Sequence, residues 1–149
     1  MSSIRNLMLV ALIVFSGILL SLNSPVVSSA KANRPGLDTQ ATFTVTNAND
    51  GGTGSLRNAM GLANISGGAD TIVFDPAFFN TPRTINLTGE LPAIQENLTI
   101  TGPGAHLLNV RRATGGNYRI FTISSGVTAT ISGLTISNGN AGTGDGGGI

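Results

Sequence analysis

The sequence predicts an all-β fold, a parallel β-helix in which short strands stack in successive coils. Composition favours β structure, because glycine is abundant (21 of 149 residues), only 10% of the residues are charged and 40% are hydrophobic. Several short segments alternate apolar and polar residues, as a strand with one buried face requires. The dipeptide Thr-Ile marks an imperfect internal repeat, which indicates stacked units. It begins at Thr71, Thr84, Thr99, Thr122, Thr130 and Thr135.

The first thirty residues have the order of a secretory signal peptide. Arg5 is followed by the uncharged apolar run Leu7–Leu22 and then by the small residues Ser28–Ala30. Cleavage is expected after Ala30 or after Ala32. An uncleaved membrane anchor is the weaker alternative, because a spanning helix needs about 20 apolar residues. We therefore divide the chain into a signal peptide (1–30), a leader (31–41) and a folded part (42–149).

The first folded elements are a strand and a short helix. Thr42–Thr46 alternates with Phe43 and Val45 on one face, which predicts a strand. Turn residues follow, and Ser55 can then cap a helix that runs to Asn64. The helix is predicted from one apolar stripe at intervals of three and four residues. The stripe consists of Leu56, Ala59, Met60 and Ala63.

Short strands are predicted from there to the end of the chain, separated by loops rich in glycine and proline. No segment between the later strands is long enough for a helix, which argues against a βαβ sheet and leaves a β-sandwich as the structural alternative. The predicted strands are Thr71–Phe74, Thr84–Leu87, Leu98–Ile100, Leu107–Val110, Phe121–Ile123, Val127–Ile131 and Leu134–Ile136.

The stretch Val127–Gly139 holds the last two predicted strands, separated by Ser132-Gly133. Alone, it fits a hairpin or a bend between two strands. Beside the similar stretches Leu98–Gly102 and Phe121–Gly126, it is better interpreted as two strands joined at a corner. Threonines then lie outside, and isoleucines stack inside on residues of neighbouring coils. The stacked isoleucines are expected to be Ile100, Ile123, Ile131 and Ile136.

Several motifs resemble the opening of bacterial secreted right-handed β-helix proteins, in which TVTNxNDxGxGSLRxAI and ADTIxF precede LTIxGPG and GLTIxNG. The corresponding segments here are Thr44–Met60, Ala69–Phe74, Leu98–Gly104 and Gly133–Gly139. The ending Gly146–Ile149 is similar to the Gly-Gly-aliphatic-Ile repeat of polymorphic outer-membrane protein families.

This resemblance implies a right-handed, pectin-lyase-like β-helix. Because the open end of such a coil exposes unpaired backbone groups, we expect the helix at Ser55–Asn64 to be the lid of its N-terminal end. The resemblance also implies a large secreted or surface-exposed protein, often of adhesin type. Because Gly146–Ile149 begins what looks like another coil, we expect the chain to be the N-terminal part of a longer protein, truncated at its C-terminus.

The acidic residues are scattered and form no Asp-Asp or Asp-x-Asp pair of the kind that polysaccharide-cleaving β-helices use. Glycoside hydrolysis also requires two neighbouring carboxylates. Asp70 is instead expected in a turn, where a contact with Arg57 is possible. We therefore predict no catalytic residue. The acids concerned are Asp50, Asp70, Asp75, Glu90, Glu96 and Asp145.

Metal and cofactor sites are not predicted either. His106 is the only histidine, cysteine is absent, and no phosphate-binding loop occurs. Removal of Arg5 would balance the acidic and basic residues, so nothing indicates nucleic acid as a partner.

The pair Arg111-Arg112 has two interpretations. It can bind an anionic glycan or the acidic face of a partner protein, but exposed loop charge is the simpler reading. We therefore expect an exported, non-catalytic module of a secreted, cell-surface or outer-membrane protein that serves adhesion or contact with glycans or surface proteins, with no membrane span after signal removal. The alternatives are a β-helix polysaccharide lyase or hydrolase with its active site beyond Ile149, and a passenger domain with a transporter barrel.

Overall fold

The computed structural model describes residues 39–113 and 115–149, all within the unit formed by Asn33–Ile149. The predicted signal peptide and nearly all of the leader lie outside the described residues. No helix among the described residues is long and apolar enough to cross a membrane. The elements are β1 (Thr42–Val45), α1 (Leu56–Ser66), β2 (Asp70–Phe74), β3 (Arg83–Leu87), β4 (Leu98–Thr101), β5 (Leu108–Arg112), β6 (Ala129–Ser132) and β7 (Thr135–Ser137).

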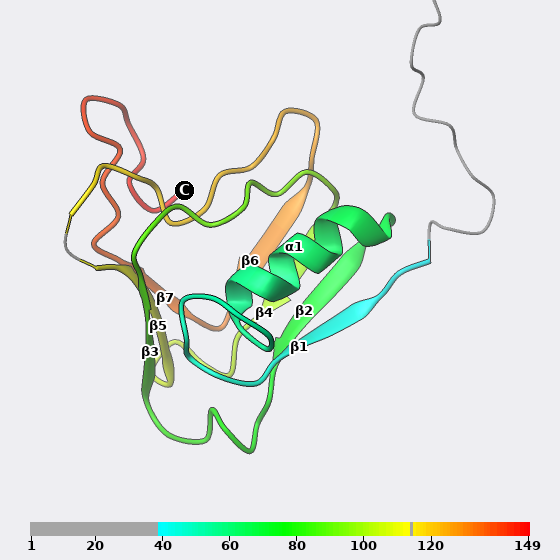
Figure 1. Cartoon of the computed structure of the whole chain (residues 1–149). Coiled ribbons are helices and arrows are strands. Elements are labelled where there is room, and N and C mark those ends of the chain that lie inside the picture. Colours follow the sequence, from blue (N-terminus) through cyan, green and yellow to red (C-terminus); the bar gives the residue numbers. More distant parts are fainter. Residues whose placement is uncertain (1–38, 114) are drawn as a thin grey trace, which may run out of the picture. The chain divides into compact units, whose positions relative to one another are not determined.

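The strands form two small parallel sheets. Sheet A has the order β1-β2-β4-β6, and sheet B has the order β3-β5-β7. From β2 onward, successive strands alternate between the two sheets. Figure 1 shows α1 lying across β1 and β2, with β3, β5 and β7 running side by side. Every strand pair is therefore closed by a crossover, because parallel neighbours cannot be joined by a hairpin.

The predicted all-β, right-handed parallel β-helix is wrong. The described chain has a mixed α/β arrangement, with two small sheets, one helix and no closed solenoid. The crossover from β1 to its parallel neighbour β2 is α1, so a β-α-β unit opens the fold. The predicted strand Phe121–Ile123 also fails to form. Outside the named strands, the described residues hold one isolated bridge, between Ile94 and Ile123, so no third sheet links the other two.

Proline and glycine explain why the segments around Ile94 and Ile123 form only a bridge and not a third sheet. Pro92 lacks the N–H that a ladder needs, and it lies just before Ile94. The glycines at 115 and 116 adopt positive φ angles of 93° and 65°, which break an extended run before residue 121. The predicted role of the helix as the lid of a β-helix is also wrong. α1 packs on β1 and β2 and is the crossover helix of the β1-α1-β2 unit.

The helix itself begins as the sequence predicts. Ser55 has an extended backbone (φ −81°, ψ 161°), and its hydroxyl accepts a hydrogen bond of 3.1 Å from the Asn58 N–H. This bond satisfies one of the free N–H groups of the first turn. The predicted apolar stripe is fully buried, and it joins the core that the strands form. Packing of this stripe, rather than helix propensity, holds the short helix in place.

In-register pairing places like residues over one another in both sheets. In sheet A, Ile72 pairs with Ile100, and Ile100 pairs with Ile131. In sheet B, Val110 lies between Ile85 and Ile136. The single predicted stack of isoleucines is thus wrong. Ile100 and Ile131 are neighbours in sheet A, Ile136 belongs to sheet B, and Ile123 meets Ile94 in the isolated bridge.

The corner at Ser132-Gly133 does join two strands in the predicted way. β6 lies in sheet A and β7 in sheet B, so the hairpin alternative is wrong. Gly133 has φ 67°, and a Cβ atom there would lie 2.5 Å from the Gly102 carbonyl oxygen. Gly102 occupies the matching corner after β4, where a Cβ atom would overlap the Gly133 carbonyl. The two corners can therefore stack only because neither residue has a side chain.

We predict that Gly133→Ala destabilises the fold more than Gly126→Ala. Both glycines have positive φ, which costs an L residue roughly 1–2 kcal/mol, but a Cβ atom at Gly126 meets nothing within 4 Å. The overlap with Gly102 should add about 1–3 kcal/mol for Gly133→Ala. Urea unfolding of both variants measures the difference. Equal losses would show that the corners do not stack.

Candidate functional site

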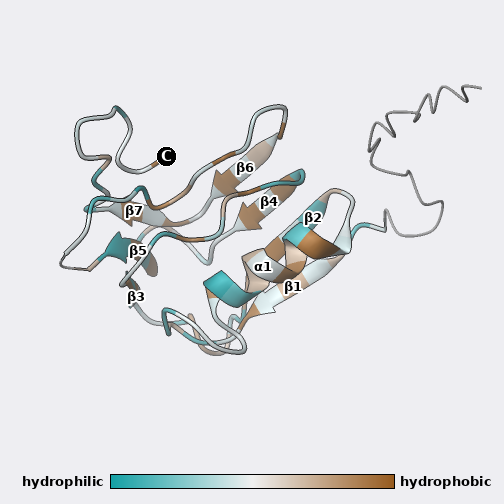
Figure 2. Ribbon diagram, turned by 45° about the horizontal axis from the view of Figure 1, so that its top comes forward, coloured by the Kyte–Doolittle hydropathy of each residue, from teal (hydrophilic) through white to brown (hydrophobic). Residues whose placement is uncertain are grey.

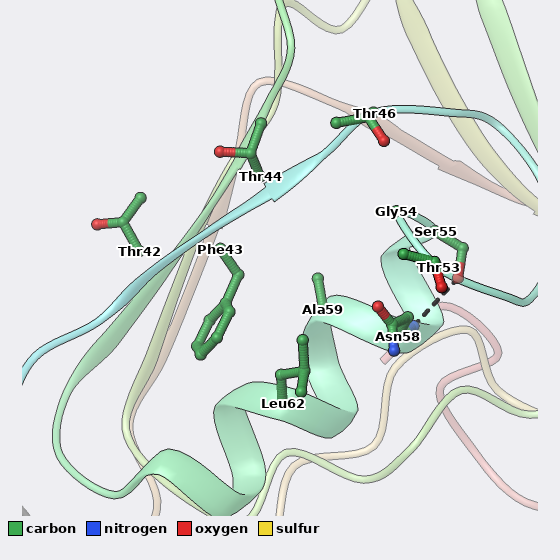
Figure 3. A pocket seen from close by; sticks show the side chains of 10 residues that line it. All are labelled: Thr42, Phe43, Thr44, Thr46, Thr53, Gly54, Ser55, Asn58, Ala59 and Leu62. Atoms are coloured by element: carbon green, nitrogen blue, oxygen red, sulfur yellow. Dashed lines mark hydrogen bonds between the residues drawn. The ribbon is translucent and has the colours of Figure 1, made fainter.

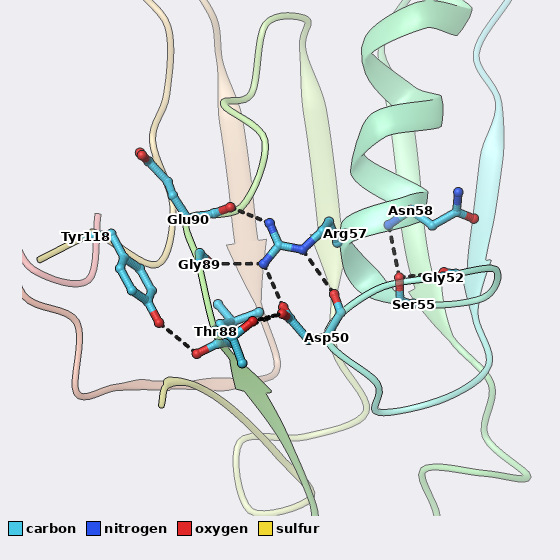
Figure 4. Close-up of polar contacts among 10 residues, drawn as sticks. Asp50, Gly52, Ser55, Arg57, Asn58, Thr88, Gly89, Glu90 and Tyr118 are labelled. Carbon is cyan, nitrogen blue, oxygen red and sulfur yellow. Dashed lines mark hydrogen bonds and ion pairs between the residues drawn. The ribbon is translucent and has the colours of Figure 1, made fainter. Parts of the chain in front are cut away.

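A polar network ties the start of α1 to the segment that follows β3. The Arg57 guanidinium forms an ion pair with Asp50, with 2.6 Å between Nη2 and Oδ1. Arg57 also donates to the Gly89 carbonyl (2.9 Å) and to the Glu90 carbonyl. The second carboxylate oxygen of Asp50 accepts from the Thr88 hydroxyl (2.5 Å) and the Thr88 N–H (3.2 Å). Figure 4 shows Arg57 between the helix and this segment, with a hydrogen bond from each of its three guanidinium nitrogens.

The electrostatics of Asp50 fit a structural role. Burial raises the pKa of its carboxyl, but hydrogen bonds from Thr88 and Arg57, together with the positive charge of Arg57, outweigh burial. The pKa of Asp50 therefore lies below its ordinary value of 3.8. A carboxylate that is ionised and bound by three donors is a poor general acid or base at neutral pH.

Asp70 is the most buried acidic residue among those that the structure describes, with 1% of its surface exposed. One of its carboxylate oxygens accepts a hydrogen bond of 2.8 Å from the Ala41 N–H, and the other accepts from the Ser66 hydroxyl. The contact with Arg57 that the sequence allowed is wrong. Asp70 instead joins the chain before β1 to the end of α1, and its buried charge is satisfied by these donors.

The other acids lie apart from this network or at its edge. Asp75 accepts from the Ala77 N–H (2.9 Å), and Glu90 accepts from the Thr122 hydroxyl (2.9 Å). Asp145 is exposed in the last turn. Among the described residues, no group of three or more His, Cys, Asp or Glu side chains is arranged to hold a metal ion.

A cavity of about 330 Å³ lies between β1 and α1. Figure 3 shows Phe43 pointing toward Leu62 across it, while Thr42 and Thr44 point away from the helix. Its polar groups include Ser55 and Asn58, which already form the helix cap. This cavity therefore offers apolar contact and threonine hydroxyls, but its lining holds no charged group.

The outer face of sheet B carries a polar surface centred on Arg111. Because Ile85, Val110 and Ile136 point into the core, the residues between them point outward. Register places Arg111 between Asn86 and Ser137, and the neighbouring row holds Thr84, Asn109 and Thr135. We call these six residues the Arg111 surface. Figure 2 shows hydrophilic residues along β5.

The structure separates the two arginines that the sequence treated as a pair, and it places both in β5 rather than in a loop. Arg112 donates to the carbonyls of Asn138 (2.8 Å), Gly115 (2.9 Å) and Gly116 (3.1 Å), so its Nε and Nη1 donors are occupied. Arg111 is half-buried, and its Nε atom is buried without a hydrogen-bond partner in the described part of the chain. A buried donor of this kind needs an explanation.

Alternation contained this distinction between the arginines. Leu108 and Val110 mark the inward positions of β5, so Arg111 had to point outward. Comparisons with protein-family models, with curated proteins and with solved structures find no match to this chain. The resemblance to polymorphic outer-membrane proteins therefore stays a prediction.

We predict that Asp50→Asn lowers the free energy of unfolding by about 1–3 kcal/mol, because it leaves the Arg57 charge without its counter-ion. Asp145→Asn, at an exposed turn, is the matched control and should have little effect. Denaturant unfolding at pH 7 compares the two variants.

The pH dependence of this loss follows from the lowered pKa of Asp50. A group with a lower pKa in the folded state stabilises the fold above its unfolded pKa, and this contribution disappears as pH falls through the folded value. The wild type and Asp50→Asn should therefore converge in stability as pH decreases below 3.8. A constant gap down to the lowest pH would contradict the ion pair.

Proposed function

We propose that this chain is an exported, non-catalytic module of a secreted or cell-surface protein, and that it binds acidic glycans through the Arg111 surface. The supporting observation is Arg111 itself, a half-buried cation on the outer face of sheet B that forms no ion pair among the described residues. Export is supported by the charged, apolar and small-residue order of residues 1–30.

Arginine suits a sugar carboxylate because its planar guanidinium can donate two parallel hydrogen bonds to the two oxygens. Partial burial strengthens that interaction, since nearby water screens it less. Arg57 is paired with Asp50, whereas Arg111 forms no ion pair within the described chain. Its charge therefore remains available to an anionic ligand.

The neighbours of Arg111 suit the uncharged part of a sugar. Asn86, Thr84 and Thr135 are exposed. The Asn86 amide and the Thr84 hydroxyl can both donate to and accept from sugar hydroxyls, whereas the Thr135 hydroxyl donates to the Ala105 carbonyl (2.7 Å) and can only accept. The Ser137 hydroxyl donates to Asn109 Oδ1 (2.8 Å), which fixes the orientation of the Asn109 amide. The surface thus combines one positive charge with neutral polar groups, as a uronic acid residue requires.

The non-catalytic part of the proposal rests on the acids. Asp50, Asp70 and Asp75 each accept hydrogen bonds from backbone or neighbouring side chains that hold local structure. No acidic residue lies on the Arg111 surface, so a bound glycan would meet no proton donor or nucleophilic carboxylate there.

We predict that the exported chain binds polygalacturonate and releases neither unsaturated sugars nor reducing ends from it. Arg111→Gln should weaken binding about tenfold or more, because a hydrogen bond to a charged group contributes about 1.5–3 kcal/mol. Arg83→Gln is the control of equal charge. Arg83 is exposed and lies over the Phe78 ring, 4.6 Å from its centroid.

Affinity electrophoresis in gels with and without polygalacturonate measures both variants. Similar weakening by Arg111→Gln and Arg83→Gln would reduce the interaction to net charge. Release of sugar by the wild type would contradict the non-catalytic assignment.

A further inference from the structure

The outer face of sheet A carries a second regular surface, which the proposed glycan site does not use. Its first row runs across all four strands and consists only of threonine. Register pairs the members of this row with one another in the order Thr42, Thr71, Thr99 and Thr130. The second row lies two residues further along each strand, and its members are Thr44, Val73, Thr101 and Ser132. We call these eight residues the threonine face.

The register fixes the spacing of the threonine face in two directions. Neighbouring strands lie about 4.8 Å apart, and residues two positions apart on one strand are separated by about 6.7 Å. Four strands in register therefore repeat a hydroxyl and a methyl group across about 14 Å of the first row, and the second row adds two further threonines beside Val73 and Ser132. Such a two-dimensional repeat favours a ligand that is itself periodic in two directions.

The side chains of the threonine face are small and uncharged. It carries no charged and no aromatic side chain, since its members are threonine, valine and serine. The Thr71 hydroxyl accepts a weak hydrogen bond of 3.5 Å from Gln40. Within the described part of the chain, no hydrogen bond is formed by the other hydroxyl groups of the face. They are therefore free to bond with an external lattice.

We propose that the threonine face binds ice. Ice is a hydrogen-bonded lattice whose oxygen atoms repeat at regular intervals in two directions, so a periodic array of hydroxyl groups can meet it at many points. Each threonine offers a hydroxyl group that can enter the lattice and a methyl group that favours ordered water around it. Many weak contacts in register then add up across the four strands, whereas a single small ligand would be held by only one or two.

Other ligands fit this face less well. An anion would find no cation here, unlike on the Arg111 surface. A neutral polysaccharide would lack the aromatic rings on which sugar rings stack. A protein strand would pair with a free sheet edge rather than with the outer face. Ordered water requires none of these features.

The test compares matched lysine substitutions on the two sheets. Thr130 and Thr84 are both exposed, and both lie on the outer face of a strand at one edge of its sheet. Thr130→Lys places a hydrated charge on the threonine face, whereas Thr84→Lys places it on sheet B. The measurements are thermal hysteresis of the exported chain and its partition into slowly growing ice.

The wild type and Thr84→Lys should show thermal hysteresis and enter the ice. Thr130→Lys should lower both by more than about tenfold, since dehydration of the ammonium group costs several kcal/mol. Thr101→Tyr, which blocks the second row with a residue favoured in strands, should act in the same direction. Circular dichroism confirms that each variant is folded.

Absence of hysteresis and of ice partition in the wild type would overturn this inference. Equal loss in Thr84→Lys and Thr130→Lys would also overturn it, as would binding of the threonine face to neutral polysaccharide in place of ice. The Arg111 surface lies on the other sheet, so polygalacturonate binding is scored separately, and failure of either proposal leaves the other to its own measurement.

Discussion

In-register parallel pairing is the constraint on which the rest of this structure depends. From β2 onward, each strand pairs with the strand two places further along the chain, and β1 pairs with β2. Alternate positions therefore keep the same face across the whole sheet. The isoleucines of sheet A then build the core, and the threonines between them build a repeating outer surface. A shift of one residue in any strand of sheet A would expose its core residues and bury its hydroxyl groups. The core and the threonine face therefore depend on the same register.

Polar contacts complete what strand pairing leaves open. Sheet A and sheet B are joined by connecting segments rather than by a ladder, and Arg57 links the segment between β3 and β4 to the start of α1 through Asp50 and two carbonyls. The Tyr118 hydroxyl donates to the Leu87 carbonyl (2.7 Å) and holds a later crossover against the end of β3. The side chains of Asp50, Arg57 and Tyr118 thus organise the loops. The Arg111 surface and the threonine face lie instead on the outer faces of the two sheets.

Local structure was predictable from the sequence, whereas the assembly of the elements was not. Alternation located most strands to within one or two residues, and Ser55 with its following stripe located α1. The β-helix failed because periodicity does not reveal that α1 is the crossover of a β-α-β unit, or that residues 121–123 form only a bridge. For the site, alternation along β5 was enough to put Arg111 on the outer face, but the sequence could not show that Arg112 is occupied, since the carbonyls that bind it come from loops whose path depends on tertiary packing.

The most direct test of this account is a methyl–methyl nuclear Overhauser experiment on the exported chain with labelled threonine and isoleucine. The register predicts contacts from the Thr99 methyl to the methyls of Thr71 and Thr130, and from Ile100 to the isoleucines of the same two strands. Contacts from Thr99 to isoleucine methyls, or the absence of both threonine contacts, would contradict the register of sheet A and with it the core row and the threonine face.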